Sequence, residues 1–461
     1  MMKNKVFSFI NIFGLTIGLT SFILIALYVF DELSFDRFHK NADNIYRVVE
    51  DQTTSEGKEI KSAGAGYLVS QKSLTDFPEI KDAARFTTFG RLNVSNTENT
   101  NVFYEDFTIA SPGFLTVFDF KLVQGNRNTA LTEPHSVIIT EETAEKLFNT
   151  ANALGKTLKI DRDSSLYKIT GILKDFPTNS HLSFNLLFSE SSITSDSFKK
   201  FLSSDWNSGT FSTYFLLNDK ADAIKVETKI NQLVKENQSD DVKDKSSFIL
   251  QPLKDIHFYS GDIEGDTIKK GNITYMYIFI VIALFILLIA CINYMNLTTA
   301  GFTKRAKEIA VRKVAGASRK ILIQQFLSEA FLITLISLTF ALLLVEILLP
   351  YFKAFTEKQL TLNVHTDYRI WLGVVAVIFV VGLLSGVYPA LFQSRLKPLQ
   401  LFKSKINIGK GNLSMRKSLV VFQFSLSIIM IIATMIVYMQ IKYVNTKDMG
   451  FNKDQLVVID I

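Results

Sequence analysis

Five long apolar segments constrain this chain more strongly than any other feature of its sequence. The first, residues 7–30, has no charged residue over 24 positions, and a second uncharged segment covers residues 273–303. Because each helical residue adds about 1.5 Å, about 20 apolar residues cross the roughly 30 Å hydrocarbon core of a bilayer. We therefore predict five transmembrane α-helices, the other three at residues 327–349, 370–394 and 418–441.

The basic start of the chain leaves two interpretations for the first segment. Lys3 and Lys5 precede it, as basic residues precede the apolar part of a secretory signal peptide. The apolar run is too long for such a peptide, however, and Asp31-Glu32 follows it without a small-residue cleavage motif. We therefore expect residues 1–30 to form the N-terminus and an uncleaved first helix.

The chain has a net charge of +6, and the excess of basic residues lies in two short loops. Residues 304–320 hold seven cations and one acid, and residues 395–417 hold seven cations and no acid. Cytoplasmic loops of membrane proteins are enriched in Lys and Arg. The N-terminus and the loops 304–326 and 395–417 are therefore predicted to be cytoplasmic. Topology explains the basic excess, so the expected partner is a lipid bilayer and not nucleic acid. The segments predicted outside are 31–272, 350–369 and 442–461.

The long segment 31–272 has the mixed composition and the turn residues of a folded domain. Apolar and β-branched residues predict strands at 45–49, 136–139, 157–160 and 167–173. Helices are predicted at 67–77 and at 141–148, the second capped by Thr140. The fold class is therefore a membrane protein: an α-helical transmembrane bundle of five spans with an inserted α+β extracytoplasmic domain. We expect a second subdomain around 190–250, with its boundary left open.

Residue patterns typical of enzymes are missing from the sequence. Gly155-Lys156-Thr157 resembles the end of a phosphate-binding loop, but the motif needs glycine where Thr150 stands. The five histidines have no metal-ligand spacing, and the single cysteine, Cys291, cannot form an intrachain disulfide. We therefore predict no catalytic, cofactor-binding or metal-binding residue, and no cofactor.

Two predicted helices carry glycines one turn apart. Gly14 and Gly18 lie in the first helix, and Gly382 and Gly386 lie in the fourth. Such pairs let helix backbones approach closely. Packing inside this bundle is the favoured interpretation, and contact with a partner chain is the alternative. Pro389 is expected to kink or end the fourth helix on its cytoplasmic side.

The cytoplasmic segment 304–318 is the most informative stretch. It has helical periodicity up to Val314, and Glu308 and Arg312 can pair at the i, i+4 spacing. Gly316 is expected to end this helix, and Ser318 to cap the next one. The chain would then leave the membrane as a helix, turn sharply and return as a helix. An ordinary basic helical hairpin explains the same pattern.

The chain resembles the MacB/FtsX-like permeases of ABC transporters. The resemblance is clearest at residues 308–318, within the segment 304–326 that we call the elbow, and in Tyr388-Pro389-Ala390 followed by residues 395–398. Three segments of the outer domain also resemble the periplasmic core domain of the family, at residues 76–80, 114–118 and 180–184.

The resemblance implies a permease subunit of the bacterial inner membrane that is not itself an enzyme. A cytoplasmic ATPase partner would hydrolyse ATP and contact the elbow, and the helices would transmit its movement to the periplasmic domain for export or extraction of a substrate. A second permease unit, as a dimer or a tandem half, is also implied, and a periplasmic adaptor is a further candidate partner. The coupling residues would be Glu308, Arg312, Lys313, Gly316 and Ala317.

The fifth helix departs from the four-helix pattern of one unit. Residues 442–461 contain a strand-like start at 455–459, which resembles the opening of a second unit of a tandem permease. We therefore expect the natural gene to continue past Ile461. A secondary transporter and a membrane-anchored sensor or receptor are the alternative functions. The resemblance leaves open whether the substrate is a drug, a lipoprotein or a peptide, or whether the complex transports none and controls cell-wall hydrolases.

Overall fold

The computed structural model divides the chain into two compact units. It describes residues 5–53, 57–96, 102–160, 163–193, 195–238, 246–266, 268–361, 368–395 and 410–447. We call residues 1–29 with 278–461 the helical unit, and residues 30–277 the inserted unit. Lys3, the predicted strand at 455–459 and residues 396–409, most of the second basic loop, lie outside the described residues.

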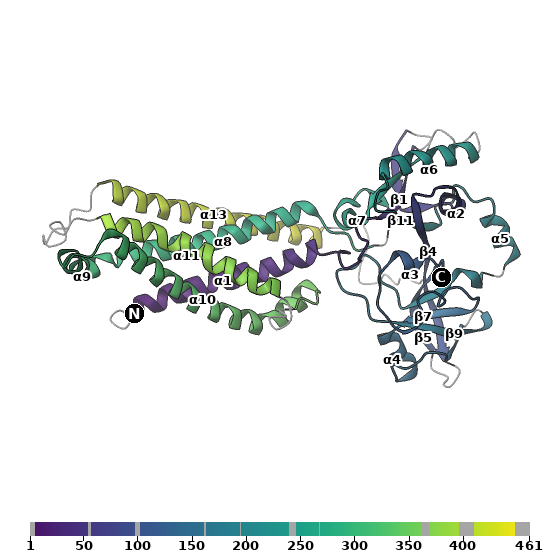
Figure 1. Ribbon diagram of the computed structural model, residues 1–461, viewed down its shortest axis with the longest axis horizontal. Coiled ribbons are helices and arrows are strands. Elements are labelled where there is room, and N and C mark those ends of the chain that lie inside the picture. The colour runs from purple at the N-terminus through teal and green to yellow at the C-terminus, as the bar shows by residue number, and fades with distance from the viewer. Residues whose placement is uncertain are drawn as a thin grey trace. The chain divides into compact units, whose positions relative to one another are not determined.

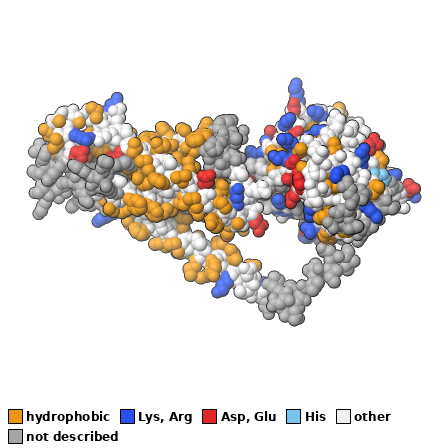
Figure 2. Space-filling view, turned by 90° about the horizontal axis from the view of Figure 1, so that it is seen from below, with side chains coloured by type: hydrophobic (Ala, Val, Ile, Leu, Met, Phe, Trp, Pro, Cys, Tyr) orange, Lys and Arg blue, Asp and Glu red, His pale blue; other side chains and the backbone are white. Residues whose placement is uncertain are grey.

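The helical unit contains five helices that are long and apolar enough to cross a membrane, which confirms the predicted five-span fold (Figure 1). Apolar side chains dominate the face of this unit in Figure 2, whereas charged side chains are scattered over the inserted unit. The five helices are α1 (Lys5–Leu33), α8 (Ile273–Ala300), α10 (Arg319–Thr356), α11 (Tyr368–Arg395) and α13 (Lys410–Thr446), and a shorter helix, α9 (Phe302–Val314), lies between α8 and α10.

Neither of the two prolines within the described helices of this unit ends its helix. Pro389 is buried, and α11 continues past it to Arg395, so the alternative in which this proline ends the fourth helix is wrong. Pro350 likewise lies inside α10, which extends well beyond the predicted span 327–349. A transmembrane helix tolerates the lost backbone hydrogen bond of a proline when neighbouring groups pack around it.

The four predicted packing glycines face other helices of the same unit. A Cβ atom on Gly18 would lie 2.5 Å from the Cβ of Ala290 in α8, and one on Gly386 would lie 2.8 Å from the Cβ of Ala330 in α10. Real carbon atoms do not approach so closely, so a side chain at either position would push the helices apart. Gly14 is less constrained, since its nearest atom is the side-chain nitrogen of Asn293 at 3.3 Å, whereas a Cβ atom on Gly382 would lie 2.6 Å from the Phe331 ring.

The inserted unit is built on a 13-stranded mixed sheet with the order β13-β2-β1-β11-β4-β5-β10-β7-β9-β6. Off this path, β12 pairs with β1, β3 with β11, and β8 with β4 and β9. The strands are β1 (Ile45–Thr53), β2 (Glu59–Ser62), β3 (Gly64–Ala65), β4 (Ile80–Asn96), β5 (Val102–Ala110), β6 (Leu122–Gly125), β7 (Ser136–Thr140), β8 (Thr157–Ile160), β9 (Asp163–Leu173), β10 (Leu186–Ser189), β11 (Phe211–Leu217), β12 (Ser246–Pro252) and β13 (Ile263–Glu264).

Short helices cover this sheet, and several local predictions agree with them. Thr140 caps α4 by accepting a hydrogen bond from the Thr143 amide, and β8 and β9 pair as an antiparallel hairpin. The helices of the unit are α2 (Tyr67–Asp76), α3 (Phe114–Val117), α4 (Glu141–Phe148), α5 (Asp196–Leu202), α6 (Ala223–Asn237) and α7 (Leu253–Tyr259), with a 3₁₀ turn η1 (Glu190–Ser192).

The long strand β4 links two lobes of the inserted unit. Its first half pairs with β11 and its last residues pair with β8, and its pairing with β5 shifts register between Thr88 and Arg91. One apolar core joins β1, β11, β12 and α6, and another joins β7, β8, β9, β10 and α4. The predicted second subdomain at 190–250 is therefore wrong, because β11 pairs between β1 and β4 and belongs to a lobe formed by both ends of the segment.

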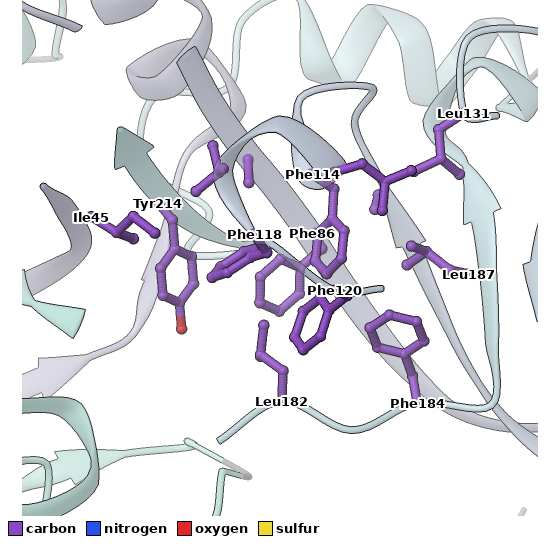
Figure 3. Packing of buried hydrophobic residues seen from close by; sticks show 14 of the residues in the cluster. Ile45, Phe86, Phe114, Phe118, Phe120, Leu131, Leu182, Phe184, Leu187 and Tyr214 are labelled. Carbon is purple, nitrogen blue, oxygen red and sulfur yellow. The ribbon is translucent and has the colours of Figure 1, made fainter. Parts of the chain in front are cut away.

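A third core, rich in phenylalanine, lies along the middle of the sheet (Figure 3). Phe114 and Phe118, which bracket α3, pack on Phe86 of β4 and on one another, with ring centroids 5.0–6.5 Å apart. Edge and offset contacts between such rings add to the stabilisation that burial provides. Because Ile45 and Leu187 belong to the same cluster, this core connects the strands of both lobes.

Candidate functional site

The elbow, residues 304–326, comprises most of α9, a turn at residues 315–318 and the first turns of α10, and hydrogen bonds close this turn. The amide of Ala317 donates to the carbonyl of Arg312 (3.0 Å), and that of Gly316 donates to the carbonyl of Lys313 (3.1 Å). These two bonds form a Schellman motif, which needs a left-handed residue, and Gly316 has φ +94°. Ser318 then caps α10 through the Ile321 amide. Local chemistry therefore sets the turn, as the sequence predicted.

An apolar contact holds α9 against the other helices of its unit. Ile309 and Ala310 are buried in a cluster with Leu322 and Phe326 of α10 and with Ala390 of α11. Burying each such side chain stabilises the contact by about 1–3 kcal/mol. One face of α9 is therefore packed inside the bundle, and among the described side chains of this helix Glu308, Val311, Arg312 and Val314 are exposed.

Arg312 ties the exposed side of α9 to α10. Its guanidinium donates to Glu308 Oε1 over 2.7 Å and to Gln325 Oε1 over 2.6 Å. The Glu308 and Arg312 side chains are about half exposed, so the pair adds only a few tenths of a kcal/mol. The structure thus brings these two predicted coupling residues together at the surface.

Lys313 points elsewhere. Its ammonium donates to the backbone carbonyl of Ser394, near the end of α11, over 2.7 Å, and Arg319 Nε lies 3.3 Å from the Ser394 hydroxyl. Partial burial and the nearby Arg319 guanidinium lower the pKa of Lys313. Of the predicted coupling residues, Lys313 is therefore engaged inside the helical unit.

Exposed apolar side chains on the elbow were not among the predicted residues. Val311 is 58% exposed, Val314 is 70% exposed, and Ile321 at the start of α10 is 55% exposed. Helical spacing separates Val311 from the buried Ile309 and Ala310, but Val314 lies one turn from Ala310, so the sequence carried no clear signal for the exposure of Val314. Apolar groups exposed beside charged ones are typical of protein–protein contact sites.

Three buried polar side chains of the inserted unit, Asp36, His181 and Tyr214, contact one another in a row that resembles a catalytic relay. His181 lies 2.9 Å from Asp36 Oδ1 through Nδ1 and 2.9 Å from the Tyr214 hydroxyl through Nε2. All three residues are buried, and burial raises the pKa of Tyr214, which disfavours the phenolate that a nucleophile would need. These three side chains therefore serve packing and hydrogen bonding.

A cavity of about 470 Å³ in the inserted unit is lined in part by His181 and Tyr214. Arg47 on its wall is 1% exposed and donates to Asp266, Gln251 and Ser260. The guanidinium is thus largely satisfied by the protein itself. Among the described residues, no group of three or more His, Cys, Asp or Glu could hold a metal ion.

Comparisons with known proteins match most of the chain to two family models. Residues 8–233 match the MacB-like periplasmic core domain, and residues 280–398 match the FtsX-like permease C-terminal domain. The first match includes α1 and most of the inserted unit, and the second includes the elbow. The two matches together therefore include parts of both units of the structure, and leave out residues 234–279 and α13.

Curated relatives are similar over shorter stretches. A macrolide export ATP-binding/permease protein MacB from Aggregatibacter actinomycetemcomitans is 27% identical over 231 residues, which are 48% of this chain and 32% of the relative. MacB from Escherichia coli is 28% identical over 150 residues, 32% of this chain and 22% of the relative. The chain thus spans about a fifth to a third of the length of these relatives.

Solved structures similar to this chain cover about half of it. A permease domain from Porphyromonas gingivalis covers 46% of the chain and 91% of its own length, at 21% identity and a TM-score of 0.41. The periplasmic region of MacB from Actinobacillus actinomycetemcomitans covers 47% of the chain and 91% of its own length, at 16% identity and a TM-score of 0.33.

Proposed function

Since the chain belongs to the MacB/FtsX-like family of ABC transporter permeases of the bacterial inner membrane, we propose that its elbow docks on a cytoplasmic ATPase. The observation that carries this proposal is the exposed side of the elbow. Val311 and Val314 stand there beside the Glu308–Arg312 pair on a turn whose backbone is fixed by Gly316. Apolar anchors rimmed by charge fit a groove on a partner protein.

The chain connectivity supports transmission of movement from this site. The elbow follows α8 directly and continues into α10, so an ATPase that moves the elbow displaces two membrane helices together. ATP-driven closure of the ATPase would reach the inserted unit through α8, which connects to it. The N-terminus and the elbow are then cytoplasmic and the inserted unit is periplasmic, in agreement with the cation counts.

Further partners follow from the same proposal. In the most apolar stretch of α13, 6% is buried within the protein. In the corresponding stretches of the other four spans, 28–39% is buried. This helix therefore has surface for a second permease unit as well as for lipid. The curated relatives are named macrolide export proteins, so export of a macrolide, with a periplasmic adaptor, is the first transport activity to test.

A charge placed beside the exposed Val311, at Val314, tests the docking site. Val314→Glu should lower recovery of the ATPase with the purified permease by about tenfold or more, since buried anchors contribute about 2 kcal/mol or more. Ile224→Glu is the matched control, because Ile224 is 74% exposed on α6 of the inserted unit. Both variants should insert normally. Equal recovery of the ATPase with Val314→Glu and the parent would refute docking through this surface.

A further inference from the structure

The inserted unit is joined to the membrane helices by two connections, and both contact one histidine. The first connection follows α1, which ends at Leu33, and the second leads into α8, which begins at Ile273. His257 lies between them in sequence, in the short helix α7. Its side chain is 4% exposed. It therefore makes its contacts within the protein.

The end of α1 and the first connection reach His257 through Glu32, the second-to-last residue of α1, and Phe35. Glu32 Oε2 lies 2.6 Å from His257 Nε2, and Glu32 is 7% exposed. The Phe35 ring stacks on the imidazole with a centroid distance of 3.6 Å and an interplanar angle of 10°. A polar contact and a flat apolar contact thus fix the imidazole from the side of α1.

The second connection reaches the same residue through its backbone and its other ring nitrogen. His257 Nδ1 lies 3.0 Å from the Lys269 carbonyl oxygen, and the amide of Gly271 donates to the His257 carbonyl over 2.7 Å. A Cβ atom on Gly271 would lie 2.4 Å from His257 Nε2. Only glycine therefore allows this segment to pass so close to the imidazole.

The two polar partners fix one proton on Nδ1 and require a second proton between Nε2 and Glu32. The Lys269 carbonyl can only accept, so Nδ1 donates to it. The Nε2–Glu32 contact then needs a second proton, held by the imidazole or by the carboxyl group. A proton between two such groups in a buried site makes a strong hydrogen bond. No other side chain offers two opposed ring nitrogens together with a flat face for Phe35.

The helix that carries His257 is anchored in the core. Leu253 and Ile256 of α7 are 0% exposed and belong to the phenylalanine-rich cluster. Ser260, just after α7, accepts from Arg47 of β1 over 2.8 Å. A force on either connection would therefore reach the central sheet through the same helix.

We propose that Glu32 and His257 form a clamp that holds both connections to α7, so that movements of α1 and α8 reach the sheet together. His257 is a positioning residue in this inference. The role in transmission depends on the proposed function, whereas the clamp itself can be measured in the permease alone.

Hydrogen exchange of the full chain in detergent tests the clamp. His257→Phe keeps the ring and removes both side-chain hydrogen bonds, and should accelerate exchange about tenfold at the amides of residues 33–37 and 269–273 together. Tyr259→Phe is the control, since Tyr259 lies on the same helix and is 56% exposed. Faster exchange in one connection alone, in neither, or throughout β1 as well would overturn the clamp.

Conservative replacement separates the hydrogen bond from bulk packing. Glu32→Gln can still donate to Nε2 and should keep exchange within about twofold of the parent, whereas Glu32→Ala should behave as His257→Phe does. Equal acceleration in Glu32→Gln and Glu32→Ala would mean that the contact is only packing, against the proposal.

Assays with the ATPase test the transmission role. In membranes that contain the partner ATPase, His257→Phe should retain ATPase binding and lose at least about tenfold in ATP-driven export of a macrolide. Unchanged export would refute the role of the clamp in transmission. Failure of the parent itself to bind any ATPase would instead refute the proposed function, and hydrogen exchange would still decide the clamp.

Discussion

Lys313 of the elbow donates a hydrogen bond to the backbone carbonyl of Ser394, at a distance of 2.7 Å. The bond joins the end of α9 to the end of α11, and the Arg319 side chain meets the Ser394 hydroxyl from α10. Three helices thus converge on one residue. Lys313 had been expected to meet the ATPase with Arg312, but its ammonium is occupied within the permease.

Replacing Lys313 by Met is expected to separate binding of the ATPase from coupling. The methionine keeps the apolar stem and loses the bond to Ser394, which contributes about 1–3 kcal/mol. ATPase recovery should stay within about twofold of the parent, while ATP-driven export falls. Copurification and export from the same membranes provide the measurement.

Lys320→Met is the matched control for this variant, because Lys320 is an exposed cation on the first turn of α10. It should leave both recovery and export near the parent values. Loss of ATPase recovery in Lys313→Met alone would show instead that Lys313 belongs to the docking surface.

The two glycines of α1 should respond differently to the same change. Gly18→Ala would place a methyl group 2.5 Å from the Ala290 Cβ, so α1 and α8 must separate, at a cost of about 1–3 kcal/mol. At Gly14 the nearest atom is the Asn293 amide nitrogen, at 3.3 Å, and a side chain can move aside. Thermal unfolding in detergent should show Gly18→Ala clearly less stable than Gly14→Ala. Equal stability of the two variants would contradict close packing of α1 on α8.

Local chemistry made much of the fold predictable from the sequence. Long uncharged runs predicted the spans, and Thr140, Gly316 and Ser318 predicted where helices begin and end, because each acts on backbone groups within a few residues. Span ends were less predictable. The helix α10 starts at Arg319, before the predicted span 327–349, because Ser318 caps it there.

Contacts between distant residues could not be predicted in this way. Lys313 and Ser394 are 81 positions apart, and Glu32 and His257 are 225 positions apart. Nothing in either local sequence specifies its partner. The same holds for β11, which pairs between β1 and β4 although a contiguous second subdomain was expected. Helical spacing could have identified the exposed Val311 once the buried face of α9 was known, whereas Val314 lies one turn from the buried Ala310, and spacing alone does not predict its exposure.

Glu50 gives the inserted unit a specific dependence on pH. It lies on β1 with 6% exposure, and burial raises its pKa from 4.5 to about 7. Between these values the folded state binds more protons than the unfolded state. Stability is therefore fully present below about pH 4.5 and falls as the pH rises through 7, by up to about 3 kcal/mol.

The buried His39 acts in the opposite direction over part of this range. Burial, as the largest cause, lowers the pKa of His39 from 6.5 to about 4. Its contribution to stability is present above pH 6.5 and is lost as the pH falls toward 4. The pH profile of the parent protein therefore combines both groups, and only a difference between two variants isolates Glu50.

Glu50→Gln should isolate it, because glutamine has the shape of the protonated acid and stays neutral at every pH. Relative to the parent, the variant should gain little at pH 4.5 and up to about 3 kcal/mol at pH 8. Trp206, packed against the core cluster that contains Val48, can report unfolding of this lobe in a Trp371→Phe background, since the chain has two tryptophans. Gln52→Asn, two residues further along β1, is the control, because it changes no ionisable group and should show no such growth with pH. An equal gain for Glu50→Gln at pH 4.5 and pH 8 would mean that ionisation of Glu50 does not limit the stability of the lobe.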